Sequence, residues 1–306
     1  MLYSHQTSWL PERTACHVLI AQSGFLGDVI LTTPLIATLH RYLNPTSLTV
    51  LTTPQAKPLL EDHPAVDRVL VDAKRTAGHG PLGLLRTARW LRQERFTLAV
   101  GVHKSLRTAL LLMLAGIPYR IGFRQSPGWL FYHRTADRDP RRHEVERILC
   151  IMQAFGLAVE ACERTPFVAY GEKAREKART LLQETGITAS EPIFIVCPGS
   201  VWATKRWTLA GFAALVRRLE DNYGRVLICG GPEDHSVAHA VYEQAGKRGV
   251  ILSGQADLQV FMALVDRARV VISNDSAPMH IAVARGVPVV AIFCATTPSL
   301  GYGPFS

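Results

Sequence analysis

The chain has 306 residues, of which 48% are hydrophobic and 19% are charged, and it carries 34 basic against 25 acidic side chains. This length is enough for two domains of ordinary size, each with its own core, and the composition excludes a disordered, collagen-like or fibrous chain. The longest wholly apolar run, residues 109–117, is far shorter than the roughly 20 residues that span a bilayer, so we predict no integral membrane segment. We find no signal peptide, and the six cysteines form no CxxC pair, which is typical of reduced core thiols in a cytosolic protein.

The positive charge is concentrated in the first half of the chain. Residues 1–170 have a net charge of +7 and residues 171–306 a net charge of +2, whereas residues 74–142 alone contain 14 basic and 3 acidic side chains, a net charge of +11. Such a surface attracts phosphate and carboxylate groups, which favours nucleic acid, anionic lipid or an acidic glycan as a partner. The alternative is a basic surface that is only solvated.

Apolar segments typical of buried strands alternate with amphipathic helical segments along the chain. We predict strands at residues 17–22, 48–52, 66–71, 97–102, 192–197, 225–229, 250–252, 270–273 and 288–293, and helices at residues 28–42, 82–94, 105–115, 171–186, 208–222, 235–245, 257–267 and 277–284. This alternation predicts an α/β protein with two doubly wound parallel sheets that helices cover on both faces. We place the domain boundary at the polar helix, which gives domains at residues 1–170 and 171–306. Because ligands of such sheets bind at the carboxyl ends of the strands, the architecture favours a small-molecule enzyme over a reader of nucleic acid.

The first motif, SGFLGD at residues 23–28, follows the first predicted strand. Its glycines allow a close backbone approach at a strand-to-helix turn, but their spacing is not GxGxxG, which argues against a dinucleotide site. Asp28 is either a helix cap or a carboxylate that acts as general base in the cleft. Pro34 kinks the helix predicted at residues 28–42, unless that helix begins later.

The second motif, PGSVWATKRW at residues 198–207, follows the strand at residues 192–197. Hydroxyl groups of Ser200 and Thr204 with the ammonium group of Lys205 suit the binding of a diphosphate. The alternative is an ordinary surface loop whose two tryptophans are hydrophobic clamps.

The third motif, SNDSAPMH at residues 273–280, lies between a strand and a helix. Asp275, Ser276 and His280 converge on the helix N-terminus, which is a favourable place for an anion. A capping arrangement with a surface histidine is the alternative. At the equivalent edge position, in GGPED, Glu233 either binds ribose hydroxyls or stabilises the start of the next helix.

We predict no metal site. Asp137-Arg138-Asp139 has the DxD pattern of metal-dependent glycosyltransferases, but we expect it in a charged loop without a preceding strand, and the histidines show no zinc-ligand spacing.

Taken together, GFLGDVILTTP, PGSVWATKRW and SNDSAPMHIAVARGVPVVAIF followed by TTP resemble the ADP-heptose:lipopolysaccharide heptosyltransferases of glycosyltransferase family 9, most closely the heptosyltransferase II type. The resemblance runs from about residue 17 to residue 304. It implies the GT-B fold, in which two Rossmann-like domains face each other across a cleft. It also implies inverting transfer of L-glycero-D-manno-heptose from ADP-heptose to the Kdo/heptose inner core of lipopolysaccharide, with no metal or other cofactor.

By the same resemblance, Asp28 matches the general base and Lys205 the lysine that stabilises the departing diphosphate. The nucleotide-sugar site is expected to comprise Ser200, Thr204, Glu233, Asp275, Ser276, Ala277 and His280. An anionic Kdo-lipid A type acceptor would meet the basic first domain, where we consider Lys104, Arg107, Arg120 and Arg124 first. We expect a cytoplasmic protein that contacts the inner membrane at most peripherally, and no nucleic-acid partner.

The chain ends directly after the third motif, so we expect it to lack the family's C-terminal end, including a helix that crosses back to the first domain. Three other functions remain open: a family 9-like transferase with another nucleotide sugar or acceptor, a nucleotide-sugar epimerase of the same fold, and a non-catalytic relative that binds polyanions.

Overall fold

The computed structural model describes residues 16–72 and 79–305. The chain divides into two compact units, Met1–Pro166 and Phe167–Ser306, each with its own sheet. The division falls a few residues before the boundary at 170/171 that the sequence suggested. The polar helix that marked this boundary is α6 (Glu172–Glu184), at the start of the second unit.

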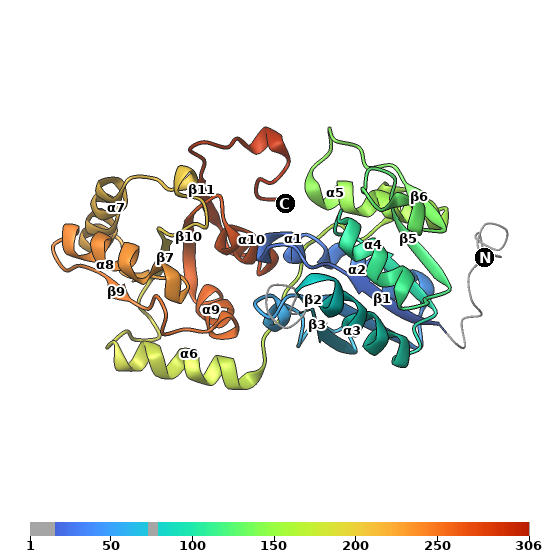
Figure 1. Cartoon of the computed structure of the whole chain (residues 1–306). Helices are drawn as coiled ribbons and strands as arrows, with labels where there is room; N and C mark the ends of the chain where they lie inside the picture. The colour runs from blue at the N-terminus through green and yellow to red at the C-terminus, as the bar shows by residue number, and fades with distance from the viewer. Residues whose placement is uncertain (1–15, 73–78, 306) are drawn as a thin grey trace. The chain divides into compact units, whose positions relative to one another are not determined.

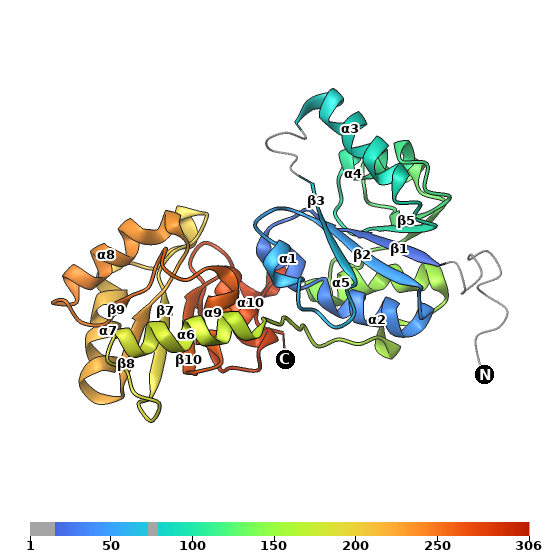
Figure 2. The same ribbon diagram turned by 90° about the horizontal axis from the view of Figure 1, so that it is seen from below.

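The first unit is built on a parallel six-stranded sheet with the strand order β3-β2-β1-β4-β5-β6. Its strands are β1 (His17–Ala21), β2 (Ser47–Thr52), β3 (Arg68–Val71), β4 (Leu98–Gly101), β5 (Tyr119–Phe123) and β6 (Arg134–Ala136). Its helices are α1 (Leu26–Ile30), α2 (Thr33–Leu43), α3 (Gly80–Gln93), α4 (Leu106–Leu114) and α5 (Glu144–Leu149). Helices α3 and α4 cover one face of the sheet, and α2 and α5 cover the other (Figure 2). Val18, Leu19 and Ile20 of the central strand β1 are fully buried, as a strand covered on both faces requires.

The second unit has a parallel five-stranded sheet with the order β11-β10-β7-β8-β9. Its strands are β7 (Ile193–Cys197), β8 (Arg225–Ile228), β9 (Val250–Ile251), β10 (Ala268–Asn274) and β11 (Val289–Ile292). After α6, its helices are α7 (Leu209–Asn222), α8 (His235–Gln244), α9 (Leu258–Val265) and α10 (Ala277–Ala284), all labelled in Figure 1. The predicted α/β class with two doubly wound sheets is therefore confirmed.

The strand orders determine where ligands meet each sheet. Chain order reverses beside β1 in the first unit, whose neighbours are β2 and β4, and beside β7 in the second, whose neighbours are β8 and β10. At such a reversal the connections leave in opposite directions and open a crevice at the carboxyl ends of the strands. The segments that follow β1, β7 and β10 contain the three sequence motifs.

Two local expectations need correction. The helix predicted at residues 28–42 is two helices, α1 and α2, and Pro34 lies in the first turn of α2, where its missing N–H removes no helical hydrogen bond. The strands β5 and β6 and the helix α5 were not predicted.

Five of the six cysteines are buried free thiols, whereas Cys294 is exposed. None of the helices in the described ranges is long and apolar enough to cross a membrane.

Candidate functional site

A lysine–aspartate pair lies at the carboxyl edge of the second sheet. Lys205 Nζ lies 2.6 Å from Asp275 Oδ2, and Thr296 Oγ1 donates a hydrogen bond of 2.8 Å to the same oxygen. The Asp275 side chain is only 6% exposed and that of Lys205 is 25% exposed. These residues follow β7, β10 and β11, so three adjacent strands bring one cation and its partners to one edge.

The loop at residues 198–207 is held in place by the end of β10. The buried Asn274 donates through Nδ2 to the carbonyl oxygens of Pro198 (2.9 Å) and Gly199 (3.3 Å), and its Oδ1 accepts from the Trp207 amide at 2.9 Å. Arg206 closes the loop through Nε and Nη2, which donate to the Ser200 carbonyl oxygen at 2.9 and 2.6 Å. Both ends of the loop are therefore fixed before any ligand arrives. Asn274 belongs to the third sequence motif, but we predicted no role for it.

The site residues predicted in the loops after β7 and β8 differ in exposure. Ser200 is buried, whereas Thr204 in the short 3₁₀ helix η6 (Ala203–Lys205) and Glu233 are exposed. The neighbour of Glu233, Asp234, is the carboxylate that organises this edge, because its Oδ2 accepts from the Gly231 amide at 3.2 Å.

Asp234 also lies against two glycines of the edge. A Cβ on Gly199 would lie 2.1 Å from Asp234 Cγ, and a Cβ on Gly230 would lie 2.7 Å from Asp234 Cβ. Burial raises the pKa of Asp234 above its ordinary value, and the Gly231 amide acts in the opposite direction. The glycines of both loops are therefore required by the close approach of this carboxyl group.

The residues predicted at α10 lie in and before its first turn. Ser276 is the N-cap residue, its Oγ lies 3.1 Å from Ser273 Oγ, and Ala277 is the first helical residue. His280 is one turn into the helix and only 5% exposed, so it is a buried histidine and not a surface one. Asp275, Ser276, Ala277 and His280 thus share one strand-to-helix turn.

Asp28 in the first unit caps α1. Its Oδ2 accepts from the Phe25 amide at 3.0 Å, and its backbone carbonyl accepts from Thr32 Oγ1 at 2.7 Å. The buried Gln22 supports the turn, because Nε2 donates to Thr32 Oγ1 and Oε1 accepts from the Gly24 amide. Asp28 is half-buried, and the bond to Phe25 fixes the direction of its carboxylate.

Two of the four predicted acceptor-binding residues have strong partners within the unit. Arg107 makes a two-pronged ion pair with the buried carboxylate of Asp72, which directly follows β3. Arg120 donates through Nε to the Phe131 carbonyl oxygen at 2.9 Å. These contacts tie both guanidinium groups to the fold.

The other two predicted acceptor-binding residues are more open. Arg124 is 64% exposed and lies 3.1 Å from Asp137. Lys104 is exposed at the carboxyl end of the sheet, and partial desolvation by the surrounding chain lowers the pKa of its ammonium group, to which the charge of Arg138 adds.

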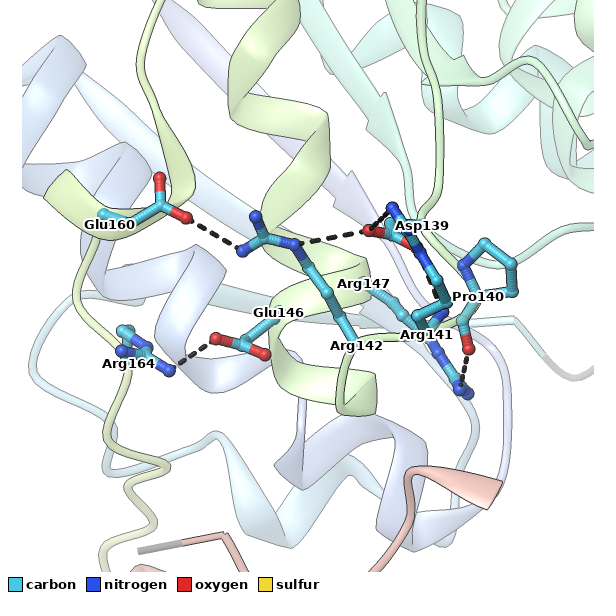
Figure 3. Close-up of polar contacts among 8 residues, drawn as sticks. All are labelled: Asp139, Pro140, Arg141, Arg142, Glu146, Arg147, Glu160 and Arg164. Atoms are coloured by element: carbon cyan, nitrogen blue, oxygen red, sulfur yellow. Dashed lines mark hydrogen bonds and ion pairs between the residues drawn. The ribbon is translucent and has the colours of Figure 1, made fainter. Parts of the chain in front are cut away.

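The carboxylates of the DxD sequence are engaged by arginines. We expected no strand directly before this sequence, and that was wrong, because β6 ends at Ala136. Asp139 contacts Arg141 and Arg142, and Arg142 continues to Glu160 at 2.9 Å beside α5 (Figure 3). Within residues 16–72 and 79–305, no group of three or more metal-ligating side chains is found.

The amino-acid sequence matches a known protein family. The family model for glycosyltransferase family 9 (heptosyltransferase) matches residues 84–304. Lipopolysaccharide heptosyltransferase 2 of Escherichia coli (strain K12) is 26% identical over 296 residues, which cover 92% of this chain and 83% of that protein.

Solved structures agree on the fold. A family 9 glycosyl transferase from Veillonella parvula superposes with a TM-score of 0.88 at 24% identity, over 94% of this chain and 84% of that one. E. coli heptosyltransferase WaaC, solved with ADP-2-deoxy-2-fluoro heptose, has a TM-score of 0.73 at 19% identity, over 92% of this chain and 90% of that one. These likenesses support the two-domain, Rossmann-like GT-B fold. Because the family model spans well over half of its length, the chain belongs to glycosyltransferase family 9 and is a glycosyltransferase.

Proposed function

We propose that this glycosyltransferase transfers L-glycero-D-manno-heptose from ADP-heptose to the Kdo/heptose inner core of lipopolysaccharide, with inversion at the anomeric carbon. The observation that carries the proposal is the carboxyl edge of the second sheet, where Asp275 contacts the ammonium group of Lys205 and accepts a hydrogen bond from Thr296. The donor is supported by the ADP-heptose analogue bound to WaaC, and the acceptor by the heptosyltransferase 2 relative.

The second unit would bind the donor. Lys205 would turn from Asp275 to the diphosphate and offset the negative charge that develops on it as the glycosidic bond breaks. Ser200, Thr204 and the first turn of α10 would supply further donors to the phosphate oxygens, and Glu233 would bind on the nucleotide side. Asp275 keeps the bond from Thr296 when the lysine moves, so its buried carboxylate stays partnered.

The first unit would bind the acceptor. Asp28 would accept the proton of the acceptor hydroxyl as that oxygen attacks the anomeric carbon from the side opposite to ADP, which inverts the configuration. The cap to Phe25 occupies one carboxylate oxygen and fixes the direction of the group. Lys104 and Arg124 would attract the Kdo and phosphate groups, and the protein would meet its lipid-linked acceptor at the cytoplasmic face of the membrane.

Two substitutions test the division of roles. Asp28→Asn keeps an oxygen that can accept from the Phe25 amide but removes the base, so we expect kcat to fall by about 10²–10⁴-fold while ADP binding, measured by calorimetry, is unchanged. Lys205→Met should weaken ADP binding as well as turnover. An Asp28→Asn variant with full activity would refute the base assignment.

A donor panel tests the substrate. We expect ADP to bind in preference to UDP, GDP and CDP, and ADP-heptose to be the donor that is turned over on a Kdo-containing acceptor. Turnover of a different nucleotide sugar would assign the chain to another family 9 specificity. Binding of polyanions without any nucleotide binding would favour a non-catalytic relative.

A further inference from the structure

Five large apolar side chains are exposed on one part of the first unit. They are Leu82 and Leu85 in α3, Leu106 in α4, and Trp129 and Leu130 in the 3₁₀ helix η3 (Trp129–Phe131), with exposed fractions of 75%, 52%, 46%, 49% and 73%. We call the surface formed by these five side chains the α3–α4–η3 face.

The three elements lie next to one another. Helices α3 and α4 lie side by side on the same face of the sheet (Figure 2). The turn before η3 lies against the start of α4, since a Cβ on Gly128 would lie 2.4 Å from Ala109 Cβ and 3.6 Å from Leu106 Cδ1. The exposed apolar groups of η3 therefore continue those of α4.

The face borders the carboxyl edge of the first sheet. Helix α4 follows β4 after a four-residue connection, so Leu106, its first residue, is at this edge. Leu82 and Leu85 lie in the first two turns of α3, which runs in the same direction as α4 because both helices precede strands of one parallel sheet. Leu82, Leu85 and Leu106 are thus at the edge that carries Asp28 and Lys104, and η3 lies beside α4 on the segment that runs from this edge back to the start of β6.

The surrounding charge is almost entirely positive. Between residues 79 and 134 the chain has nine basic side chains and one acidic one, Glu94, which pairs with Arg68. Arg86 and Arg89 are exposed on α3, Lys104 is exposed in the connection before α4, and Arg124 is exposed directly after β5. Asp72 and Asp137, just outside this range, pair with Arg107 and Arg124, and Arg86, Arg89 and Lys104 contribute further exposed charge. Large exposed apolar groups with charged groups around them mark interaction surfaces, and here the charge is positive.

We propose that the α3–α4–η3 face docks on an anionic membrane surface, with Trp129 and Leu130 entering the boundary between headgroups and acyl chains. Anionic lipid satisfies both properties of the face, because headgroups attract the cations and acyl chains take up the apolar side chains, and tryptophan favours this boundary. The inference rests on the proposed function in one respect: a lipid-linked acceptor would then present its sugar at the edge that carries Asp28.

Vesicle binding without acceptor or donor tests the docking directly. The purified full chain is floated with vesicles of phosphatidylcholine alone or of phosphatidylcholine mixed with phosphatidylglycerol. We expect binding to the mixed vesicles that weakens as salt is added, and little binding to the neutral ones. Trp129→Ser combined with Leu130→Ser should lower the partition coefficient roughly tenfold or more, as expected for about 1.4 kcal/mol of lost apolar burial.

Matched control variants distinguish docking through this face from nonspecific adsorption of the protein to vesicles. Val201, 71% exposed on the second unit, is the control for Leu130, and Val201→Ser should leave vesicle binding unchanged. Arg86→Gln with Arg89→Gln should weaken binding roughly fivefold for each charge, whereas Lys173→Gln with Arg179→Gln on α6 should not. Circular dichroism and the melting temperature establish that each variant is folded.

The outcomes divide cleanly. Vesicle binding that persists in the Trp129/Leu130 variant, or that falls equally in the Val201 control, would overturn the proposal. So would sedimentation showing that the face joins two copies of the chain while vesicle binding is unaffected by its variants. Failure of vesicle binding with intact heptose transfer to a short water-soluble acceptor would reject the docking face alone. Vesicle binding without heptose transfer would reject the proposed function alone.

Discussion

Gly24→Ala tests whether the turn around Asp28 is built for a catalytic carboxylate. A Cβ on Gly24 would lie 2.6 Å from Asp28 Oδ2 and 3.1 Å from Gln22 Oε1. An ordinary van der Waals contact begins at 3.4 Å, so the carboxylate has to move by about 0.8 Å. A displacement of about 1 Å at a reacting group can cost about 10²-fold in rate, and we expect a loss of about 10–10²-fold in kcat/KM.

The assay measures kcat/KM with ADP-heptose and a Kdo-containing acceptor, alongside the dissociation constant of ADP. ADP binding should be unchanged, because the residues proposed to bind the nucleotide belong to the second unit. Gly303→Ala is the matched control, since a Cβ there would lie 3.4 Å from Pro298 Cβ, an ordinary contact.

Overpacking also carries a cost in stability of roughly 1–3 kcal/mol, so the variant must be assayed well below its melting temperature. A folded Gly24→Ala enzyme whose kcat/KM stays within twofold of the native value would refute the reasoning, because the carboxylate position would then not limit the reaction.

Four further predictions concern groups whose environments the structure defines. Thr296→Val removes the neutral donor to Asp275, and calorimetry should show ADP binding weakened by roughly tenfold. Tyr132→Phe should raise the free energy of unfolding by about 1 kcal/mol in urea titrations, because the buried Tyr132 hydroxyl has no hydrogen-bond partner among the described residues. Burial lowers the pKa of His63 from 6.5 to about 4, so the stability present above pH 6.5 should fall by about 3 kcal/mol as the pH drops through this window, and His63→Asn should abolish the fall. Asp234 has a raised pKa, so native stability should decrease as the pH rises through it; Asp234→Asn should melt higher at neutral pH, and the difference should vanish below about pH 3.

The placement of the second and third motifs at one edge of the second sheet was predictable from the sequence, because each motif follows or overlaps the end of a predicted strand. Lys205 and Asp275 are 70 residues apart in the chain, but both follow strands that the apolar runs predicted. In a parallel sheet the carboxyl ends of neighbouring strands meet at one edge, so adjacency of the motifs followed once the two strands were taken as neighbours. Asn274, which fixes the loop, was missed because a buried amide with three backbone partners leaves no pattern in the sequence.

The second half of the first unit was less predictable, because its elements are short and its contacts are long-range. The strand β6 has three residues and α5 has six, so neither shows a full period of hydrophobic alternation. The partner of Arg107 is Asp72, 35 residues earlier, and no spacing rule connects the two. A count of positive charges found the basic region but could not separate arginines that stabilise the fold from those that face solvent.

The Lys205–Asp275 pair links the stability of the proposed donor site to its proposed function. A partly buried ion pair gains little over water, because desolvation offsets much of the Coulomb attraction. A second donor to the same carboxylate changes this balance: with Thr296 in place, Asp275 remains hydrogen-bonded when the ammonium group leaves. A diphosphate carries more negative charge than one carboxylate and brings several acceptor oxygens, so it competes effectively with Asp275 for the ammonium group of Lys205. Asp275 therefore holds the Lys205 ammonium group in place when no ligand is bound, and the free-energy cost of moving that group to a diphosphate stays small.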